Sequence, residues 1–283
     1  NLDLSNVIID FKFSKYVEGL NAYTTLRSIY IKDCIITSDG AEAIAEAIKQ
    51  LSAIERISIS RCQMAQEDLK KMTSALKNIS TLQVCYIQSM ILESDLNPDV
   101  SGLCWNQYSR ISTLTDTLKM NANLYWLSLD ANNLGDFDMQ LLGKVLGTNK
   151  GLKYLGLSGN SIGSAGARAI AEGLEINKKL EYLCLKNNNF GDAGTVYFAK
   201  ALGTNDCLRH VRLIANDIGR VGAMALADML MVNTRLEGLD LGLNRIGCVG
   251  AKFLSRSLRH NCQLEDLNLD FNGIRNIGAV SLA

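Results

Sequence analysis

Apolar residues recur along this chain in a fixed order, in which leucine or isoleucine takes the first, fourth and sixth places of a short segment. The clearest copy is LKYLGLSGN, which runs from Leu152 to Asn160. Alternation of apolar and polar residues with a period of two is typical of a β-strand. The segment therefore predicts a short strand that leads into a polar turn.

The same segment restarts at a regular interval, which predicts a solenoid of about nine turns. Each step is 28 residues long, except one of 42 residues between Leu82 and Leu124. Leu2 and Leu4 are the strand leucines of a partial first turn. The starting residues are Leu26, Ile54, Leu82, Leu124, Leu152, Leu180, Leu208, Leu236 and Leu264.

Asparagine closes the segment in six turns, at positions 132, 160, 188, 216, 244 and 272. Its side chain can bond backbone groups of the neighbouring turn, and unpaired backbone groups are costly in an apolar core. We therefore expect a polar ladder of stacked asparagines. Cys34 and Cys62 occupy the same position in the early turns.

A glycine-rich loop and a helix complete each turn. Ala167, Ile170, Ala171 and Leu174 recur at intervals of three and four, as the apolar side of a helix does. Each helix is predicted to end near an asparagine in a left-handed cap. These asparagines are at positions 121, 149, 177, 205, 233 and 261.

A 28-residue unit with a full helix and the motif N-x-I-G-x-x-G-A resembles the ribonuclease-inhibitor-like class of leucine-rich repeats. Repeat domains of NOD-like receptors and axonemal leucine-rich adaptors are similar. The resemblance implies an α/β solenoid, or horseshoe, with a parallel β-sheet on the concave face and α-helices on the convex face.

We interpret residues 1–283 as a single leucine-rich-repeat domain, with irregular turns in 1–123 and regular turns in 124–283. The long step places an insertion near 91–110, which holds Trp105 and Tyr108. Insertions in repeats map to loops, often on the binding face. This one is either a contact loop or a plug over the early turns. Neither end of the chain has the polar cap that a solenoid needs, so we expect an excerpt of a longer chain.

Composition and charge narrow the classes of function. Hydrophobic residues make up 47% of the chain, and 29 basic residues balance 29 acidic ones. No basic excess exists to neutralise nucleic acid. No apolar run reaches the roughly 18 residues needed to span a membrane. The eight cysteines follow no stapling pattern, which indicates reduced thiols and a cytoplasmic location, cytoskeletal or ciliary sites included.

Catalytic, cofactor and metal motifs are absent from the sequence. The two histidines, His210 and His260, fall on different elements, and no zinc or phosphate-loop pattern occurs. We therefore predict no enzyme activity, cofactor or small-molecule substrate. A GTPase-activating protein of the Ran type, which the chain resembles only in fold, would need an exposed arginine. Arg56 and Arg61 are the candidates for that role.

The binding candidates lie at strand positions between the leucines, on the expected concave face. Four rings follow one another on successive strands, and exposed aromatics are enriched in binding hot spots. The same rings could simply stabilise the ladder by cross-strand stacking. Basic and acidic residues also separate along this face, which favours a partner with a basic patch. The candidates are Trp126, Tyr154, Tyr182, His210, Arg212, Asp240, Asp266 and Asp270, with Trp105 and Tyr108 in the insertion.

The sequence thus predicts a protein-interaction scaffold or adaptor that binds a protein partner on the concave face, the 91–110 loop, or both. Two alternatives remain. One is the ligand-sensing region of a NOD-like immune receptor, and the other is GTPase activation of the Ran type.

Overall fold

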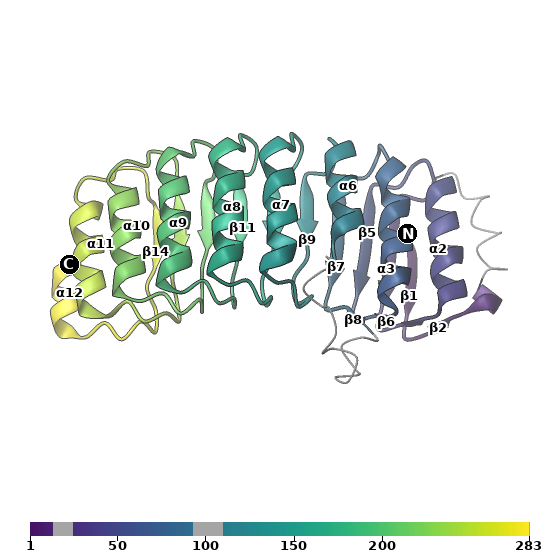
Figure 1. Ribbon diagram of the computed structural model, residues 1–283, viewed down its shortest axis with the longest axis horizontal. Helices are drawn as coiled ribbons and strands as arrows, with labels where there is room; N and C mark the ends of the chain where they lie inside the picture. Colours follow the sequence, from purple (N-terminus) through teal and green to yellow (C-terminus); the bar gives the residue numbers. More distant parts are fainter. Residues whose placement is uncertain (14–24, 93–109, 283) are drawn as a thin grey trace. The chain divides into compact units, whose positions relative to one another are not determined.

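The computed structural model describes residues 1–13, 25–92 and 110–282. The chain forms two compact units, residues 1–132 and 133–283. Figure 1 shows the turns of each unit side by side.

The first unit contains five parallel strands in chain order. They are β1 (Leu2–Ser5), β3 (Ser28–Lys32), β5 (Arg56–Ser60), β7 (Val84–Gln88) and β9 (Trp126–Ser128). Its helices are α2 (Ser38–Gln50), α3 (Gln66–Ala75), the short η1 (Leu76–Asn78) and α6 (Ser112–Met120). Val84 pairs with Trp126 across the 42-residue step. The insertion therefore leaves the strand register intact.

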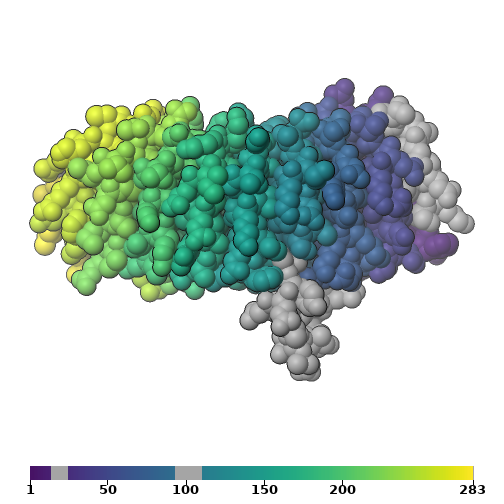
Figure 2. Space-filling view, turned by 45° about the horizontal axis from the view of Figure 1, so that its top comes forward, coloured from purple at the N-terminus to yellow at the C-terminus, as the bar shows by residue number. Residues whose placement is uncertain are grey.

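The second unit repeats strand and helix more regularly, with helices in one layer and strands behind them (Figure 1). Its strands are β10 (Tyr154–Gly156), β11 (Tyr182–Cys184), β12 (His210–Arg212), β13 (Gly238–Asp240) and β14 (Asp266–Asn268). Its helices are α7 (Asp136–Thr148), α8 (Ser164–Ile176), α9 (Gly191–Thr204), α10 (Arg220–Leu230), α11 (Gly247–Leu258) and α12 (Asn276–Leu282). In the space-filling view the turns of this unit follow one another in chain order (Figure 2).

The core lies between the two layers, where the sequence pattern places it. Leu155 and Leu157 of one strand segment and Ile170 and Leu174 of the following helix are fully buried. The predicted fold class is confirmed: parallel strands form one layer, and helices cover it.

The asparagine ladder is present. The Asn188 side-chain amide donates to the Leu157 carbonyl of the preceding turn and the Leu185 carbonyl of its own turn, both at 2.9 Å. Its Oδ1 accepts from the Ile162 N–H at 3.1 Å. Cys62 takes this position in the first unit, and its thiol donates to the Ile31 carbonyl at 3.6 Å. The prediction that cysteine replaces asparagine here is therefore confirmed.

A second, smaller sheet in the first unit was not predicted. Its strands are β2 (Ile8–Ile9), β4 (Ile35–Ile36), β6 (Gln63–Met64) and β8 (Ile91–Leu92). The Gln63 N–H donates to the Cys34 carbonyl at 2.9 Å. A thiol is a poor acceptor compared with an amide oxygen. In these turns the loop backbones therefore pair with each other instead of with a side chain.

The predicted left-handed caps at the helix ends are wrong. Asn177 has φ −64° and ψ 134°, an extended conformation. Its Oδ1 accepts from the N–H groups of Lys179 and Leu180, and its amide donates to the Leu146 carbonyl at 2.6 Å. These asparagines form a second ladder between turns, and the extended backbone is the conformation in which the amide makes these bonds.

The left-handed backbone occurs instead one residue before the first ladder position. From Asp33 onward, the residue at this position has φ between 51° and 64° in every described turn. They are Asp33, Arg61, Ser89, Ala131, Gly159, Asn187, Ala215, Leu243 and Phe271. Their types share no pattern, so this conformation could not be predicted from the residues at these positions.

Candidate functional site

The solvent side of strands β10 to β14 is here called the sheet face. The middle residue of each strand is directed into the core, as with the fully buried Leu155 and Leu183. The first and third residues therefore point to the opposite side, away from the helices. Most of the candidate binding residues lie on this surface.

Three rings line the sheet face and form what we call the ring stripe: Tyr154, Tyr182 and His210. The register places them on adjacent strands. Tyr154 and Tyr182 are stacked, with ring centroids 4.8 Å apart and planes at 22°. His210 follows at 5.8 Å from Tyr182, with a tilt of 43°. The Arg212 guanidinium carbon lies 5.4 Å from the centre of the Tyr182 ring.

The ring stripe has a polar component as well as an apolar one. Burial raises the pKa of Tyr182, so its hydroxyl stays protonated to a higher pH than that of a free tyrosine. The side chain of His210 is 48% exposed. The stripe therefore offers ring surface, a phenolic hydroxyl and an exposed imidazole together.

Trp126 lies in the first unit, on β9. Its ring is tilted against that of Tyr86, at 6.4 Å between centroids and 50° between planes. Both side chains are half-buried. Sequence reasoning missed Tyr86 because only one position of each strand was read for rings, and Tyr86 lies two residues further along.

Gly238 explains why the ring stripe ends at His210. A Cβ atom on Gly238 would lie 2.6 Å from Nδ1 of His210. A side chain at position 238 would require the exposed imidazole to move away from β13. The sequence showed this glycine merely as an interruption of the rings.

Charges on the sheet face are partly neutralised within the molecule. Arg209 forms an ion pair with Glu237, and His210 Nε2 lies 3.8 Å from the second oxygen of that carboxylate. The other charged candidates differ in exposure: Arg212, Asp266 and Asp270 are exposed, whereas Asp240 is half-buried and accepts from the Gly242 N–H at 3.2 Å. Acidic side chains thus remain available toward β14.

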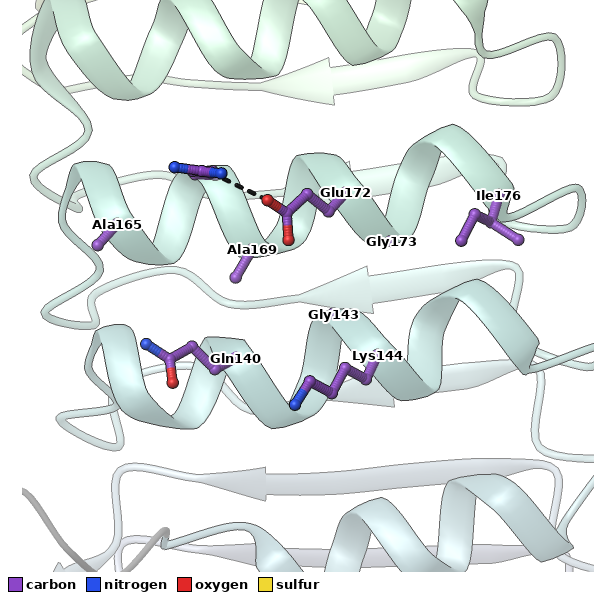
Figure 3. A pocket seen from close by; sticks show the side chains of 9 residues that line it. Gln140, Gly143, Lys144, Ala165, Ala169, Glu172, Gly173 and Ile176 are labelled. Carbon is purple, nitrogen blue, oxygen red and sulfur yellow. Dashed lines mark hydrogen bonds and ion pairs between the residues drawn. The ribbon is translucent and has the colours of Figure 1, made fainter.

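A hollow of about 580 Å³ lies on the other layer, between α7 and α8 (Figure 3). The two helices approach closely because Gly143 and Gly173 lack a Cβ; one added at Gly143 would lie 2.1 Å from the Ala169 carbonyl oxygen. Lys144 and an Arg168–Glu172 ion pair of 2.9 Å border it. The hollow contains no set of polar groups that converge on one point.

The arginines considered for GTPase activation have partners. Arg61 donates to both carboxylate oxygens of Asp33, at 2.6 and 2.7 Å. Arg56 donates to the Tyr30 hydroxyl at 3.5 Å. Both guanidinium groups are therefore engaged by side chains of the preceding turn.

The remaining features of the described ranges concern metal ligands, helix length and cysteines. Residues 1–13, 25–92 and 110–282 contain no cluster of three or more metal-ligating side chains. Within the same ranges, no helix has the length and apolar character to cross a membrane. The seven cysteines found there are free thiols. Trp105 and Tyr108 fall outside the described residues.

Comparisons with known proteins give the following similarities. A family model described as "Leucine Rich repeat" matches residues 24–45, 148–171, 177–199 and 260–283. A search of curated proteins found no match. Among solved structures, the chain is similar to an internalin from Listeria monocytogenes, with 15% identity and a TM-score of 0.45 over 94% of this chain and 80% of that chain.

Proposed function

We propose that this chain is a non-enzymatic scaffold that holds a partner protein on the sheet face of the second unit. The observation that carries the proposal is the ring stripe, with Arg212 beside it, on the solvent side of adjacent strands. Proteins built from leucine-rich repeats generally act in protein–protein interaction.

Rigid aromatic side chains supply contact area at a low cost in conformational entropy. Tyrosine and arginine are also the residue types enriched in binding hot spots. The strands that carry them are tied together by the asparagine ladder, as the bonds from Asn188 to two turns illustrate. A surface that is already ordered loses little entropy on binding, which favours affinity.

The acidic side chains toward β14 favour a partner with a basic surface. Asp266 and Asp270 are exposed. A basic patch on the partner would meet them while another part of the partner covers the rings. Such matching mainly sets specificity and the rate of association.

Two finer features belong to this proposal. The free thiols are typical of a reducing compartment, so we place the scaffold in the cytoplasm. Trp105 and Tyr108 are proposed to add a second contact from the 91–110 insertion. Replacing both with alanine should weaken capture of the partner without changing the melting temperature.

The principal test is a pull-down from native extract, read by mass spectrometry, with the parent chain and a Tyr154→Ala, Tyr182→Ala variant. We expect a partner that the parent recovers and the still-folded variant loses. Phe137→Ala, an exposed aromatic residue on α7 of the helix layer, is the matched control and should recover the partner. Equal recovery by parent and variant would contradict binding through the rings.

A further inference from the structure

The outer surface of helices α9, α10 and α11 carries exposed apolar side chains, of which Tyr197 also contacts the Arg168 guanidinium of α8, 5.3 Å from the ring centroid. Val196 and Tyr197 lie on α9, Val221 and Met224 on α10, and Val249 on α11, and we call these five residues the helix patch. Between 39% and 53% of each residue is exposed. A contiguous exposed apolar surface of this kind is typical of an interaction site.

The five residues of the helix patch are neighbours because of the repeat. Met224 follows Val196 by 28 residues, and Val249 follows Val221 by the same step. Helix α10 packs against both α9 and α11. Equivalent positions on packed helices lie side by side, so the apolar side chains form one surface and are not scattered.

The repeat does not require an apolar residue at the position that Val196 and Met224 share. The equivalent residues are Gln140 on α7 and Arg168 on α8. Both are exposed, on helices that pack just as the later ones do. The position that Val221 and Val249 share is apolar in the earlier turns as well, with Phe137, Ala165 and Ala193. Val196 and Met224 therefore widen the apolar surface on α9 and α10 at a position where the stack tolerates polar residues.

Basic side chains surround the helix patch. Lys200, Arg220, Lys252 and Arg256 are exposed, and none of them forms an ion pair with another described residue. Asp228 is the acidic residue among them on α10. On α8, in contrast, Arg168 is neutralised by Glu172. The surface of α9 to α11 thus combines apolar area with an excess of free cations.

We propose that the helix patch docks an acidic, amphipathic helical segment of a partner protein. Apolar side chains of that segment would cover Val221, Met224 and Val249, and its carboxylates would pair with the surrounding lysines and arginines. An amphipathic helix laid on an apolar surface is a common mode of recognition. The charge excess selects an acidic segment over a basic one, because like charges brought together are strongly disfavoured.

This surface is separate from the sheet face. The helix patch belongs to the helix layer and the ring stripe to the strand layer of the same unit. The charges differ as well: the strand side carries both Arg212 and the exposed carboxylates Asp266 and Asp270, whereas mainly lysines and arginines surround the helix patch. The second unit therefore offers two distinct surfaces for binding.

The test uses two fluorescein-labelled synthetic peptides of the same leucine spacing, one with glutamate and one with lysine at every polar position. Fluorescence anisotropy with the full chain should show saturable binding of the glutamate peptide and none of the lysine peptide. A Lys200→Glu, Lys252→Glu, Arg256→Glu variant should bind the glutamate peptide at least about tenfold more weakly. Met224→Glu should weaken binding as well, since it removes apolar area.

Matched controls separate this site from the other surfaces. Lys144→Glu, on the equivalent position of α7, and the Tyr154→Ala, Tyr182→Ala variant should bind the glutamate peptide as the parent does. Failure of the glutamate peptide to bind, equal binding of both peptides, or an unaffected triple variant would overturn the proposal. So would binding to phosphatidylserine vesicles that the glutamate peptide does not compete away, because that would assign the surface to lipid.

Discussion

Leu243 has a left-handed backbone conformation, with φ 56°, although its side chain gains nothing from it. The residue is 53% exposed. Its N–H donates to the Asp270 carbonyl at 2.8 Å, which fixes the conformation from the neighbouring turn. A left-handed conformation costs an ordinary residue about 1–2 kcal/mol, and asparagine tolerates it better. Asn187 has the same conformation at the equivalent position, with φ 54°.

We therefore predict that Leu243→Asn raises the free energy of unfolding by about 1 kcal/mol, measured by urea denaturation. Gly159 occupies the equivalent position with φ 64°, so Gly159→Leu should lower the stability by a similar amount. Two changes of opposite sign at equivalent positions would establish the conformational cause. A loss of stability in Leu243→Asn would contradict it.

The cysteines differ in their chemical environment. Backbone N–H groups of Arg275 and Gly278 lower the pKa of Cys248, and the Arg275 N–H lies 3.4 Å from its sulfur. Burial raises the pKa of Cys62 to about 11 and that of Cys85 to about 12. The thiolate is the reactive form, so reactivity follows these shifts and the exposure of each sulfur.

Alkylation with iodoacetamide at pH 7.5, mapped by peptide mass spectrometry, should modify Cys248 well before Cys62 and Cys85. Because the pKa of Cys248 is lowered, its rate should level off at a lower pH than that of an unfolded control peptide. The two buried thiols should react only after denaturant is added. Rapid labelling of Cys85 in the native protein would show that the core between strand and helix opens.

The element that most determines this fold is the asparagine ladder. Asn244 is buried and donates to the carbonyls of Leu213 and Leu241, both at 2.9 Å. It accepts from the N–H groups of Asn216 and Ile218. One side chain thus satisfies four backbone groups in two turns, and each group left without a partner costs about 1–3 kcal/mol.

Asn244→Leu should therefore lower the free energy of unfolding by about 3 kcal/mol or more, and Asn244→Cys by clearly less. The reason for the difference is that Cys62 already donates to a carbonyl of the preceding turn in this protein. Urea denaturation of the two variants measures it. Equal losses would mean that the thiol of Cys62 contributes nothing to its own turn.

Elements were predictable from the sequence where one residue type serves one purpose. The strand leucines, the ladder asparagines and the cysteines that replace them all have a recurring spacing and a single chemical reason. The helix-end asparagines were misread, because left-handed caps and side-chain ladders use the same residue. The left-handed position before Asn244 was missed, since bonds from the next turn impose it on any residue type.

The residues of the candidate site could be predicted from the sequence, but the contacts between their side chains could be predicted only in part. Tyr154, Tyr182 and His210 could be placed on one face by spacing alone. The pairing of Arg209 with Glu237 could not, because adjacent strands bring together residues 28 positions apart whose side-chain directions the sequence does not give. Part of the charge separation that the sequence predicted is therefore neutralised by an ion pair within the sheet face.

At the scale of the whole molecule, a formal net charge of zero conceals an uneven distribution. Within the second unit, free cations collect on the helix layer and free carboxylates toward β14 on the strand layer. The composition alone gave no reason to expect nucleic acid or any other charged partner. Only the assignment of each residue to a layer shows that basic and acidic side chains are both exposed and available for binding.

The stacking of turns in the whole unit also determines how far the effect of one substitution extends. In the second unit, the helices that pack together are sequence neighbours, such as α10 with α11, and the strands pair in chain order. In such a stack, stability is approximately a sum over turns and the interfaces between neighbouring turns. Asn244→Leu should therefore speed amide exchange in β12, β13 and β14 while leaving β10 close to the parent, as hydrogen–deuterium exchange with mass spectrometry would resolve. Uniformly faster exchange from β10 to β14 would mean that the unit opens only as a whole, and the ring stripe would then lose its order whenever any single turn is weakened.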